Sequence, residues 1–206
     1  LGAQYDITEI DGFDDLHDPH GILAEAMDRA ARLWGSDRCF FLVNGSTCGI
    51  LAAISAAAKN SGSGRIILAR NCHKSVYNAV ELCSLAPIYL APPPVDGFGF
   101  CGSISPRDVE KAVTANPGTP VVLTSPTYEG VLTNVAEIAV VCHLWGSPLI
   151  VDEAHGAHLG FSPEFTGSAV AAGADIVVQS LHKTLTGLTQ TGLLQLSGGL
   201  VPASDI

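Results

Sequence analysis

A single lysine, Lys183, lies between His182 and Thr184 in the stretch SLHKTLTGLTQTG, which follows an apolar run. The chain contains only ten lysine and arginine residues among its 206 residues. A lysine amine held in a suitable site attacks an aldehyde and forms a Schiff base, whereas a structural lysine pairs with a carboxylate. The stretch by itself favours these two interpretations about equally, so the rest of the sequence must decide between them.

A second stretch, FLVNGSTCGILAAISAAAK, leads from a predicted strand into a predicted helix through Gly45, Ser46 and Thr47. Free backbone N–H groups at the start of a helix bind anions, and two hydroxyl groups beside them add further donors. The stretch is therefore a candidate phosphate site. Ordinary capping of the helix by Ser46 or Thr47 accounts for the same residues and is favoured when the stretch is taken alone.

An acid and an imidazole follow two further predicted strands. Asp152 lies at the end of the apolar run in PLIVDEAHGAH, and His73 follows the run in RIILARNCHKS. The carboxyl ends of strands carry the ligand-binding residues of α/β sheets, although a histidine such as His73 can also cap a helix or hydrogen-bond within the core. The letters DEAH do not indicate a helicase, because the sequence contains no G-x-x-x-x-G-K-[ST] loop. His155 and His158 lack a third ligand at a suitable spacing, so we predict no metal site.

Together, these features match the requirements of pyridoxal phosphate. Its phosphate needs an anion site, its aldehyde needs an amine, and an imidazole can stack on its ring. Its pyridine nitrogen needs a carboxylate that keeps it protonated, because the pyridinium form is the strong electron sink. The sequence therefore predicts a pyridoxal phosphate site at the ends of three strands and the start of one helix.

Apolar runs rich in β-branched residues alternate with helical patterns from residue 38 onward. Most runs are continuous rather than alternating, which is typical of strands buried on both faces. We predict strands at residues 38–43, 65–69, 87–91, 120–125, 148–153, 174–180 and 192–197, and helices at residues 20–34, 46–59, 73–85, 105–115, 134–144 and 166–172. This order predicts an α/β fold of three layers, doubly wound, with a mostly parallel seven-stranded sheet. Residues 181–191 are too polar for a good helix, so the last strand is expected to return antiparallel.

The composition narrows the class of partner. The formal net charge is -10 and the sequence has no cluster of Lys or Arg, which argues against nucleic-acid binding. No apolar stretch is long enough to span a membrane, so no membrane association is expected. Six scattered cysteines without a C-x-x-C pair are typical of reduced thiols inside a cell. We therefore expect a cytoplasmic protein, with an organelle such as a plastid as the alternative.

Five blocks of sequence, in one order along the chain, resemble the major domain of the Orn/Lys/Arg decarboxylases, a family of fold type I pyridoxal phosphate enzymes. The blocks are FFLVNGSTCGILAAI, RNCHKSVYNAVEL, TSPTYEGVLTNV, VDEAHGAHLGF and SLHKTLTGLTQTG, and the last resembles the family's cofactor attachment signature. The resemblance extends from about Thr8 to about Ser197. It implies that residues 1–206 form a pyridoxal phosphate-binding major domain, truncated at both ends, because the chain begins with Leu1 and stops at Ile206 without a C-terminal domain.

The resemblance assigns roles to individual residues. Lys183 is expected to bind the cofactor covalently, Asp152 to pair with the pyridine nitrogen and His73 to stack on one face of the ring. Ala154 is expected to pack under the other face, and His155 to lie near the substrate, so that Lys183, Asp152, His73 and His155 form the catalytic group. The resemblance also implies contacts with the phosphate or the ring hydroxyl from Gly45, Ser46, Thr47, Thr127, Ser180 and His182.

The activity implied by the resemblance is decarboxylation of arginine, lysine or ornithine to the amine and carbon dioxide. It also implies a homodimer or larger homo-oligomer, because a second subunit completes fold type I active sites. A fold type I aminotransferase or lyase is the alternative. A non-catalytic remnant that binds only the cofactor or a partner subunit is a third interpretation, because substrate-binding residues are expected largely in the missing C-terminal part.

Overall fold

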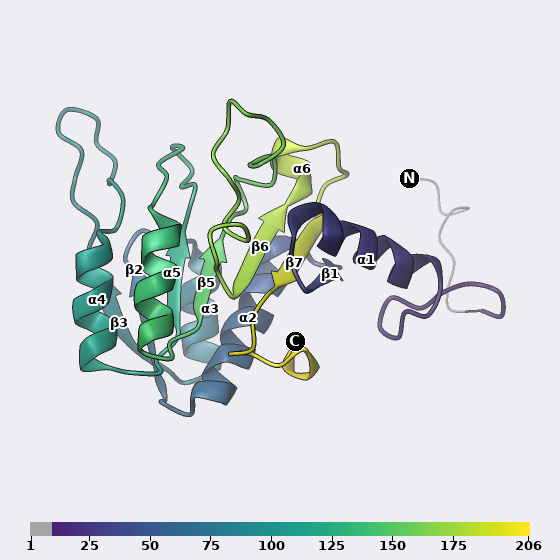
Figure 1. Ribbon diagram of the computed structural model, residues 1–206, viewed down its shortest axis with the longest axis horizontal. Helices are drawn as coiled ribbons and strands as arrows, with labels where there is room; N and C mark the ends of the chain where they lie inside the picture. The colour runs from purple at the N-terminus through teal and green to yellow at the C-terminus, as the bar shows by residue number, and fades with distance from the viewer. Residues whose placement is uncertain (1–9) are drawn as a thin grey trace.

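The computed structural model describes residues 10–206, so Thr8, where the family resemblance begins, lies outside the described residues. A seven-stranded sheet runs through them in the order β1-β7-β6-β5-β4-β2-β3 (Figure 1). The strands are Arg38–Leu42 (β1), Arg65–Ala69 (β2), Ala86–Leu90 (β3), Val121–Thr124 (β4), Leu149–Asp152 (β5), Ile176–Ser180 (β6) and Gly192–Leu196 (β7). All seven predicted strands are confirmed, with β2 at its predicted bounds and the ends of the others shifted by one or two residues.

The sheet is mostly parallel, as predicted. Strands β3, β2, β4, β5 and β6 pair in parallel, while β7 is antiparallel to both of its neighbours, β6 and β1. The predicted antiparallel return of the last strand is therefore confirmed. The polar connection before it contains only one short helical turn, Leu181–Thr184 (α6).

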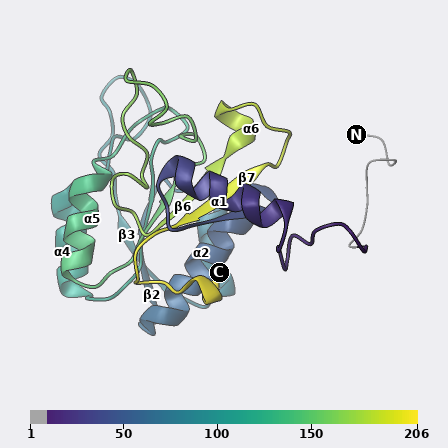
Figure 2. The ribbon, with the colours of Figure 1, turned by 45° about the vertical axis from the view of Figure 1, so that its right-hand side comes forward.

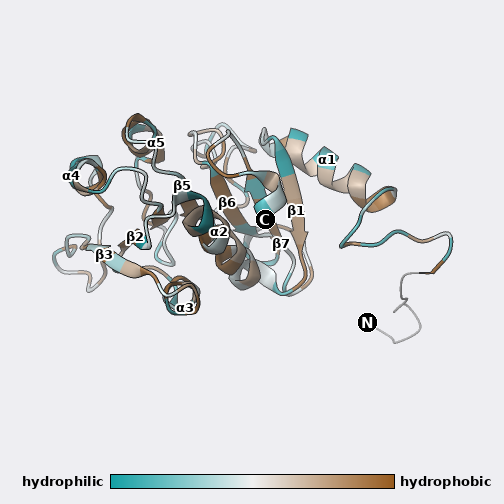
Figure 3. Cartoon of the chain, turned by 90° about the horizontal axis from the view of Figure 1, so that it is seen from below, coloured by the Kyte–Doolittle hydropathy of each residue, from teal (hydrophilic) through white to brown (hydrophobic). Residues whose placement is uncertain are grey.

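Helices cover both faces of the sheet and complete the three layers. The longer helices are Ile22–Trp34 (α1), Gly45–Ser61 (α2), Lys74–Leu82 (α3), Pro106–Ala115 (α4) and Val135–Leu144 (α5). Helices α2 and α3 lie on one face, and α1, α4 and α5 lie on the other (Figure 3). Because successive strand residues point to opposite faces, Ile150 packs in the α2 and α3 layer and Val151 in the α4 and α5 layer. Both side chains are fully buried, which fits the continuous apolar pattern of β5.

The loops that follow the parallel strands gather at one end of the sheet (Figure 2). Two helix starts there follow from their sequences: Ser105 Oγ accepts the N–H of Arg107 at the start of α4, and Asn134 Oδ1 accepts the N–H of Glu137 at the start of α5. These two caps fix the residues at which α4 and α5 begin.

The predicted helix over residues 166–172 is wrong. Residues 169–173 form turns, and the N–H of Ala172 donates to the carbonyl of Ser168 at 3.0 Å in a single helical turn. The N–H of Ala169 donates to the carboxylate of Glu153 at 2.6 Å, and Gly173 has a φ of +92° that ends the segment. The apolar spacing of the segment therefore reflects its packing against the α5 side of the sheet, where Ala169 is buried.

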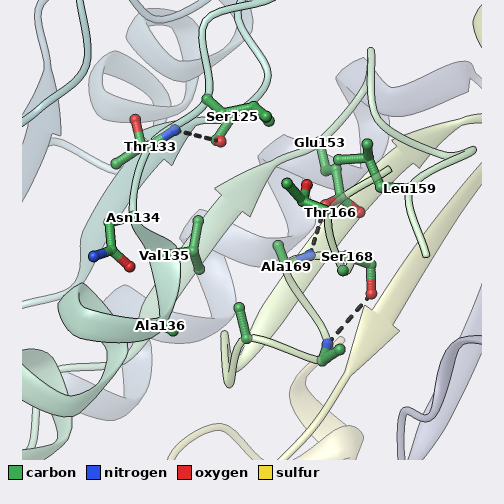
Figure 4. A pocket seen from close by; sticks show the side chains of 14 residues that line it. Ser125, Thr133, Asn134, Val135, Ala136, Glu153, Leu159, Thr166, Ser168 and Ala169 are labelled. Carbon is green, nitrogen blue, oxygen red and sulfur yellow. Dashed lines mark hydrogen bonds between the residues drawn. The ribbon is translucent and has the colours of Figure 1, made fainter. Parts of the chain in front are cut away.

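A chain of buried polar side chains crosses the sheet on this same face. Besides Ala169, the Glu153 carboxylate accepts the side-chain N–H of Gln179 at 2.7 Å (Figure 4 shows the contact with Ala169). Gln195 donates to the Gln179 amide oxygen at 3.4 Å, and Ser36 donates to the Gln195 amide oxygen at 2.7 Å. Glu153, Gln179 and Gln195 are each at most 1% exposed, so the chain carries polar groups from the end of β5 through β6 and β7 to the surface near α1.

This environment makes the stability of the fold depend on pH. Burial raises the pKa of Glu153 to about 7, from the ordinary value of 4.5, even though the bonds from Ala169 and Gln179 lower it. The unfolded chain therefore releases this proton near pH 4.5, whereas the folded chain holds it until about pH 7. A carboxyl group with a raised pKa contributes stability fully below the lower value and loses that contribution as the pH rises through the higher one.

We predict that Glu153→Gln flattens the pH dependence of unfolding. As the pH rises from about 4.5 to above 7, the free energy of unfolding of the unsubstituted protein should fall relative to that of the variant, by about 3 kcal/mol at most. Urea denaturation at a series of pH values measures this difference. Parallel pH profiles for the two proteins would contradict the prediction.

Candidate functional site

A cavity of about 540 Å³ opens at the carboxyl ends of β2, β4 and β5, beside the starts of α2 and α3. Parallel strands place their carboxyl ends at the same edge of the sheet, so residues distant in sequence meet there. The cavity brings together a large part of the predicted site, namely Ser46, His73, Thr127, Asp152, Ala154, His155 and Lys183.

Lys183 lies on α6, directly after β6, and its amine points toward an imidazole. Lys183 is exposed to the cavity, and its Nζ lies 3.2 Å from Nε2 of His155. Burial and then the positive charge of Lys183 lower the pKa of His155. The His155 ring also packs edge-on against Tyr128, with 5.6 Å between the ring centroids. A neutral His155 can therefore accept a hydrogen bond from the ammonium group of Lys183.

No carboxylate within residues 10–206 lies at ion-pair distance from Lys183. The interpretation of Lys183 as a structural lysine required such a partner. The arrangement therefore favours a lysine that is available to a ligand.

Asp152 ends β5 and places a buried carboxyl group against the cavity. Its side chain accepts the N–H of Ala154 at 3.1 Å, and the residue is only 5% exposed. Burial raises the pKa of Asp152, while the bond from Ala154 and the electrostatic effect of Lys183, His73 and His155 oppose that rise. Because burial dominates, the ionised carboxylate would be stabilised further by a cation within the cavity.

His73 both caps a helix and lines the cavity. Its Nδ1 accepts the N–H of Ser75 at 3.2 Å at the start of α3, and the same nitrogen lies 2.8 Å from the Ser75 hydroxyl. The Ser75 side chain is fully buried, so the imidazole is held by a rigid part of the core. The helix-capping interpretation of His73 therefore describes its Nδ1 side, and the rest of the ring borders the cavity.

The start of α2 keeps its backbone N–H groups available. The residue before the helix, Asn44, makes no side-chain cap, and neither Ser46 nor Thr47 caps it, so the ordinary capping interpretation is wrong. Gly45 opens the helix with a φ of +68°, a conformation that residues with a Cβ rarely adopt. The uncapped N–H groups at this helix start form a candidate anion site.

Strand β7 approaches this helix start very closely. A Cβ on Gly192 would lie 3.2 Å from backbone atoms of Gly45, Ser46 and Gln179, so only glycine fits without displacement. The hydroxyl of Ser180 donates to the hydroxyl of Ser46 at 2.9 Å. The end of β6, the start of β7 and the start of α2 are therefore packed as one unit.

Four predicted site residues do not line the cavity. Ser180 reaches it only through Ser46, and Gly45 contributes backbone behind the same residue. Thr47 is exposed on the outside of the helix. The Nδ1 of His182 lies 3.1 Å from the carbonyl of Thr191, which orients the ring without placing it in the cavity lining.

Other residues line the cavity that the sequence reasoning did not single out. They come from the ends of β2 and β4 and from the Pro- and Gly-rich loop after β3, and comprise Asn71, Gly99, Phe100, Cys101, Thr124, Tyr128 and Glu129. The Oγ1 of Thr124 is buried and has no hydrogen-bond partner. Its position at the end of β4 is the same signal that identified Asp152, and that signal could have found it.

Residues 10–206 show neither a metal cluster nor a membrane span. No three or more of their His, Cys, Asp and Glu side chains gather as metal ligands would. None of the helices in this range is long and apolar enough to cross a bilayer.

Comparison with known proteins identifies the family. The family model for the Orn/Lys/Arg decarboxylase major domain matches residues 3–205. The chain belongs to the Orn/Lys/Arg decarboxylase family. The resemblance seen in the five sequence blocks is thereby confirmed.

Two curated relatives and one solved structure indicate how this decarboxylase-family chain compares with whole proteins. It is 44% identical over 193 residues to the uncharacterized protein YaaO of Bacillus subtilis, covering 93% of the chain and 40% of the relative. It is 38% identical over 203 residues to an arginine decarboxylase of Halalkalibacterium halodurans, covering 98% and 41%. The structure of the constitutive lysine decarboxylase of E. coli superposes with a TM-score of 0.73 at 28% identity, covering 90% of the chain and 28% of that protein. The chain thus spans about 40% of the length of these two curated relatives.

We predict that Gly192→Ala destabilises the site and the fold. The added Cβ must push backbone atoms on two sides, so the free energy of unfolding should fall by about 1–3 kcal/mol. Gly199→Ala is the matched control, because a Cβ there meets nothing within 4 Å. Chemical denaturation of both variants measures the effect, and equal stability of the two would contradict the close approach.

Proposed function

We propose that this chain is the cofactor-binding part of a pyridoxal phosphate-dependent decarboxylase that converts arginine, lysine or ornithine into its amine and carbon dioxide. The observation that carries the proposal is one cavity bordered by the amine of Lys183, the carboxyl group of Asp152 and the imidazole of His73. Membership of the Orn/Lys/Arg decarboxylase family supports the reaction class. The relatives named as arginine and lysine decarboxylases support a basic amino acid as the substrate.

The residues present fit pyridoxal phosphate. The uncapped start of α2, at Gly45 and Ser46, offers N–H groups and a hydroxyl for the phosphate, with Thr47, Ser180 and His182 proposed as further contacts. The close packing at Gly192 brings backbone near this anion site without an obstructing side chain. The unpartnered Oγ1 of Thr124 offers a further hydrogen bond within the cavity, beside the proposed contact from Thr127.

Asp152 is proposed to keep the ring nitrogen protonated. Its buried carboxylate lacks a full countercharge, and a protonated pyridine nitrogen would provide one. When bound, the cofactor supplies a sink for the electron pair left on the substrate's Cα as carbon dioxide departs. Ala154 and the Ser75-held ring of His73 are proposed to fix the plane of that ring, and a fixed plane determines which substrate bond breaks.

His155 is proposed to orient the amine of Lys183. The Nε2 of His155 lies 3.2 Å from Nζ of Lys183, within hydrogen-bond distance. Because burial and the positive charge of Lys183 lower the pKa of His155, its neutral form can accept a hydrogen bond from the Lys183 ammonium group. This contact would hold the lysine amine beside the cavity, where the aldehyde of the cofactor is proposed to bind.

We propose a homodimer or larger homo-oligomer as the working form, in the cytoplasm. The cavity rim includes Tyr128, which is 84% exposed, so a second subunit has access to the site. All six cysteines, which lie within the described residues, are free thiols, and this supports a reducing compartment.

The first test concerns the lysine. Lys183→Ala should abolish covalent attachment of pyridoxal phosphate, because no other amine borders the cavity among the described residues. Borohydride reduction followed by peptide mass spectrometry should place the cofactor on the peptide that contains residue 183. Lys59→Ala is the control, since Lys59 pairs with Asp205 away from the cavity. Attachment that survives Lys183→Ala would refute the assignment.

The second test concerns the reaction. The protein expressed at the full length of its gene should release carbon dioxide from at least one of arginine, lysine and ornithine in the presence of pyridoxal phosphate. Lys183→Ala should lower the rate by roughly a thousandfold or more, within the range spanned by catalytic groups. Transfer of the amino group to a keto acid without carbon dioxide release would instead indicate an aminotransferase.

A further inference from the structure

Glu153 is a buried residue next to Asp152 in the sequence, but its carboxyl group does not line the cavity that contains Asp152 and Lys183. It follows Asp152 directly, and because strand residues alternate, its side chain points to the opposite face of the sheet. There it accepts the N–H of Ala169 at 2.6 Å and the side-chain N–H of Gln179 at 2.7 Å, and it borders a second cavity of about 370 Å³ (Figure 4). No step of the proposed reaction uses this carboxyl group.

Gln179 is likewise next in sequence to a residue of the candidate site, Ser180, and its side chain also lies outside the cavity. It precedes Ser180, whose hydroxyl bonds to Ser46 at the anion site, and its own side chain points to the opposite face. Gln179 is fully buried, and its amide oxygen accepts from Gln195 on β7. The bond between Glu153 and Gln179 thus joins the two residues that lie back to back with Asp152 and Ser180.

This bond sits where β5 and β6 separate. Their last paired residues are Asp152 and Val178, and the N–H of Glu153 makes the last backbone bond, to the carbonyl of Val178 at 2.9 Å. Beyond that point, the segment after β5 turns toward His155, and the segment after β6 enters α6, which carries Lys183. The position of Lys183 relative to Asp152 therefore depends on how firmly the two strand ends are tied.

We infer that Glu153 is a positioning residue that, through Gln179 and Ala169, sets the placement of Asp152 against Ser180 and Lys183. The inference rests on the proposed function, because it concerns the geometry offered to pyridoxal phosphate. Replacing the carboxylate by a methyl group leaves two buried N–H donors without partners, and the strand ends then separate or shift to find new ones. The effect reaches the cofactor site through the backbone, since the side chain itself does not touch the cavity.

An amide at residue 153 can preserve the hydrogen bond to Gln179 that links the ends of β5 and β6. A glutamine at residue 153 keeps an oxygen for the N–H of Ala169 and turns its NH₂ group toward Gln179. The Gln179 and Gln195 amides then rotate in turn, and the last NH₂ group donates to the hydroxyl of Ser36. Glu153→Gln is therefore the conservative variant, and Glu153→Ala is the disruptive one.

Asp175 supplies a matched control at the far end of the same two strands. Its buried carboxylate accepts the N–H of Leu149 at 2.7 Å, where β5 begins, and contacts Nε2 of His143 at 3.0 Å. Asp175→Ala thus removes an equivalent buried carboxylate without disturbing the end that carries the site.

The experiment measures pyridoxal phosphate binding by the full-length protein above pH 7, together with the visible circular dichroism of the bound cofactor. Glu153→Ala should raise the dissociation constant by about tenfold, the scale of effect known for residues that orient metal ligands, and should change the dichroism. Glu153→Gln should restore both measurements to near the unsubstituted values. Asp175→Ala should lower the unfolding temperature without changing either measurement.

The outcomes separate this inference from the proposed function. If the unsubstituted protein does not bind pyridoxal phosphate, both fail. If it binds and Glu153→Ala binds with the same constant and dichroism, while only its unfolding temperature falls, the positioning role alone is overturned. Should Glu153→Ala not fold, Gln179→Leu decides, because it breaks the same tie and leaves the bond to Ala169. Unchanged binding and dichroism in that variant would also overturn the inference.

Discussion

The parallel pairing of β4, β5 and β6 is the constraint on which the candidate site depends. Its register sets Thr124 beside Asp152, and Asp152 beside Val178, so the polar ends of three strands emerge together. The register itself is fixed by burial, because the central strands are enclosed on both faces by apolar side chains. A slip of one residue would turn Asp152 to the face covered by α4 and α5, and the cavity would lose its carboxyl group.

The same alternation separates two neighbouring acids whose charges would otherwise compete. Asp152 faces a cavity in which Lys183 and two imidazoles oppose, without overcoming, the rise in its pKa that burial causes. Glu153 faces amide donors instead, and burial outweighs their effect on its pKa. One residue of separation along the strand therefore gives the carboxyl groups different surroundings, one open to a ligand and one closed within the protein.

The sequence predicted the strands and much of the site because both follow from local signals: continuous apolar runs, and polar residues directly after them. It failed where the decisive partner is distant. The segment over residues 166–172 looked helical, but the N–H of Ala169 is taken by Glu153, sixteen residues earlier. The start of α2 is packed closely against Gly192, far along the chain, and the sequence around Ser46 gives no sign of that contact. The loop that supplies Phe100 to the cavity lacks any periodicity, so its contribution could not be read from sequence.

The pairing of β1 with β7 has a consequence for the order in which the molecule forms. Arg38 lies opposite Leu196, so this ladder joins strands that are separated by most of the described chain. Closing so long a loop is entropically costly, and such contacts form late in folding. The start of α2 follows β1 directly and is packed against Gly192 at the start of β7. The proposed anion site would therefore form only after β1 and β7 have paired, and phosphate binding there would report that this late contact is in place.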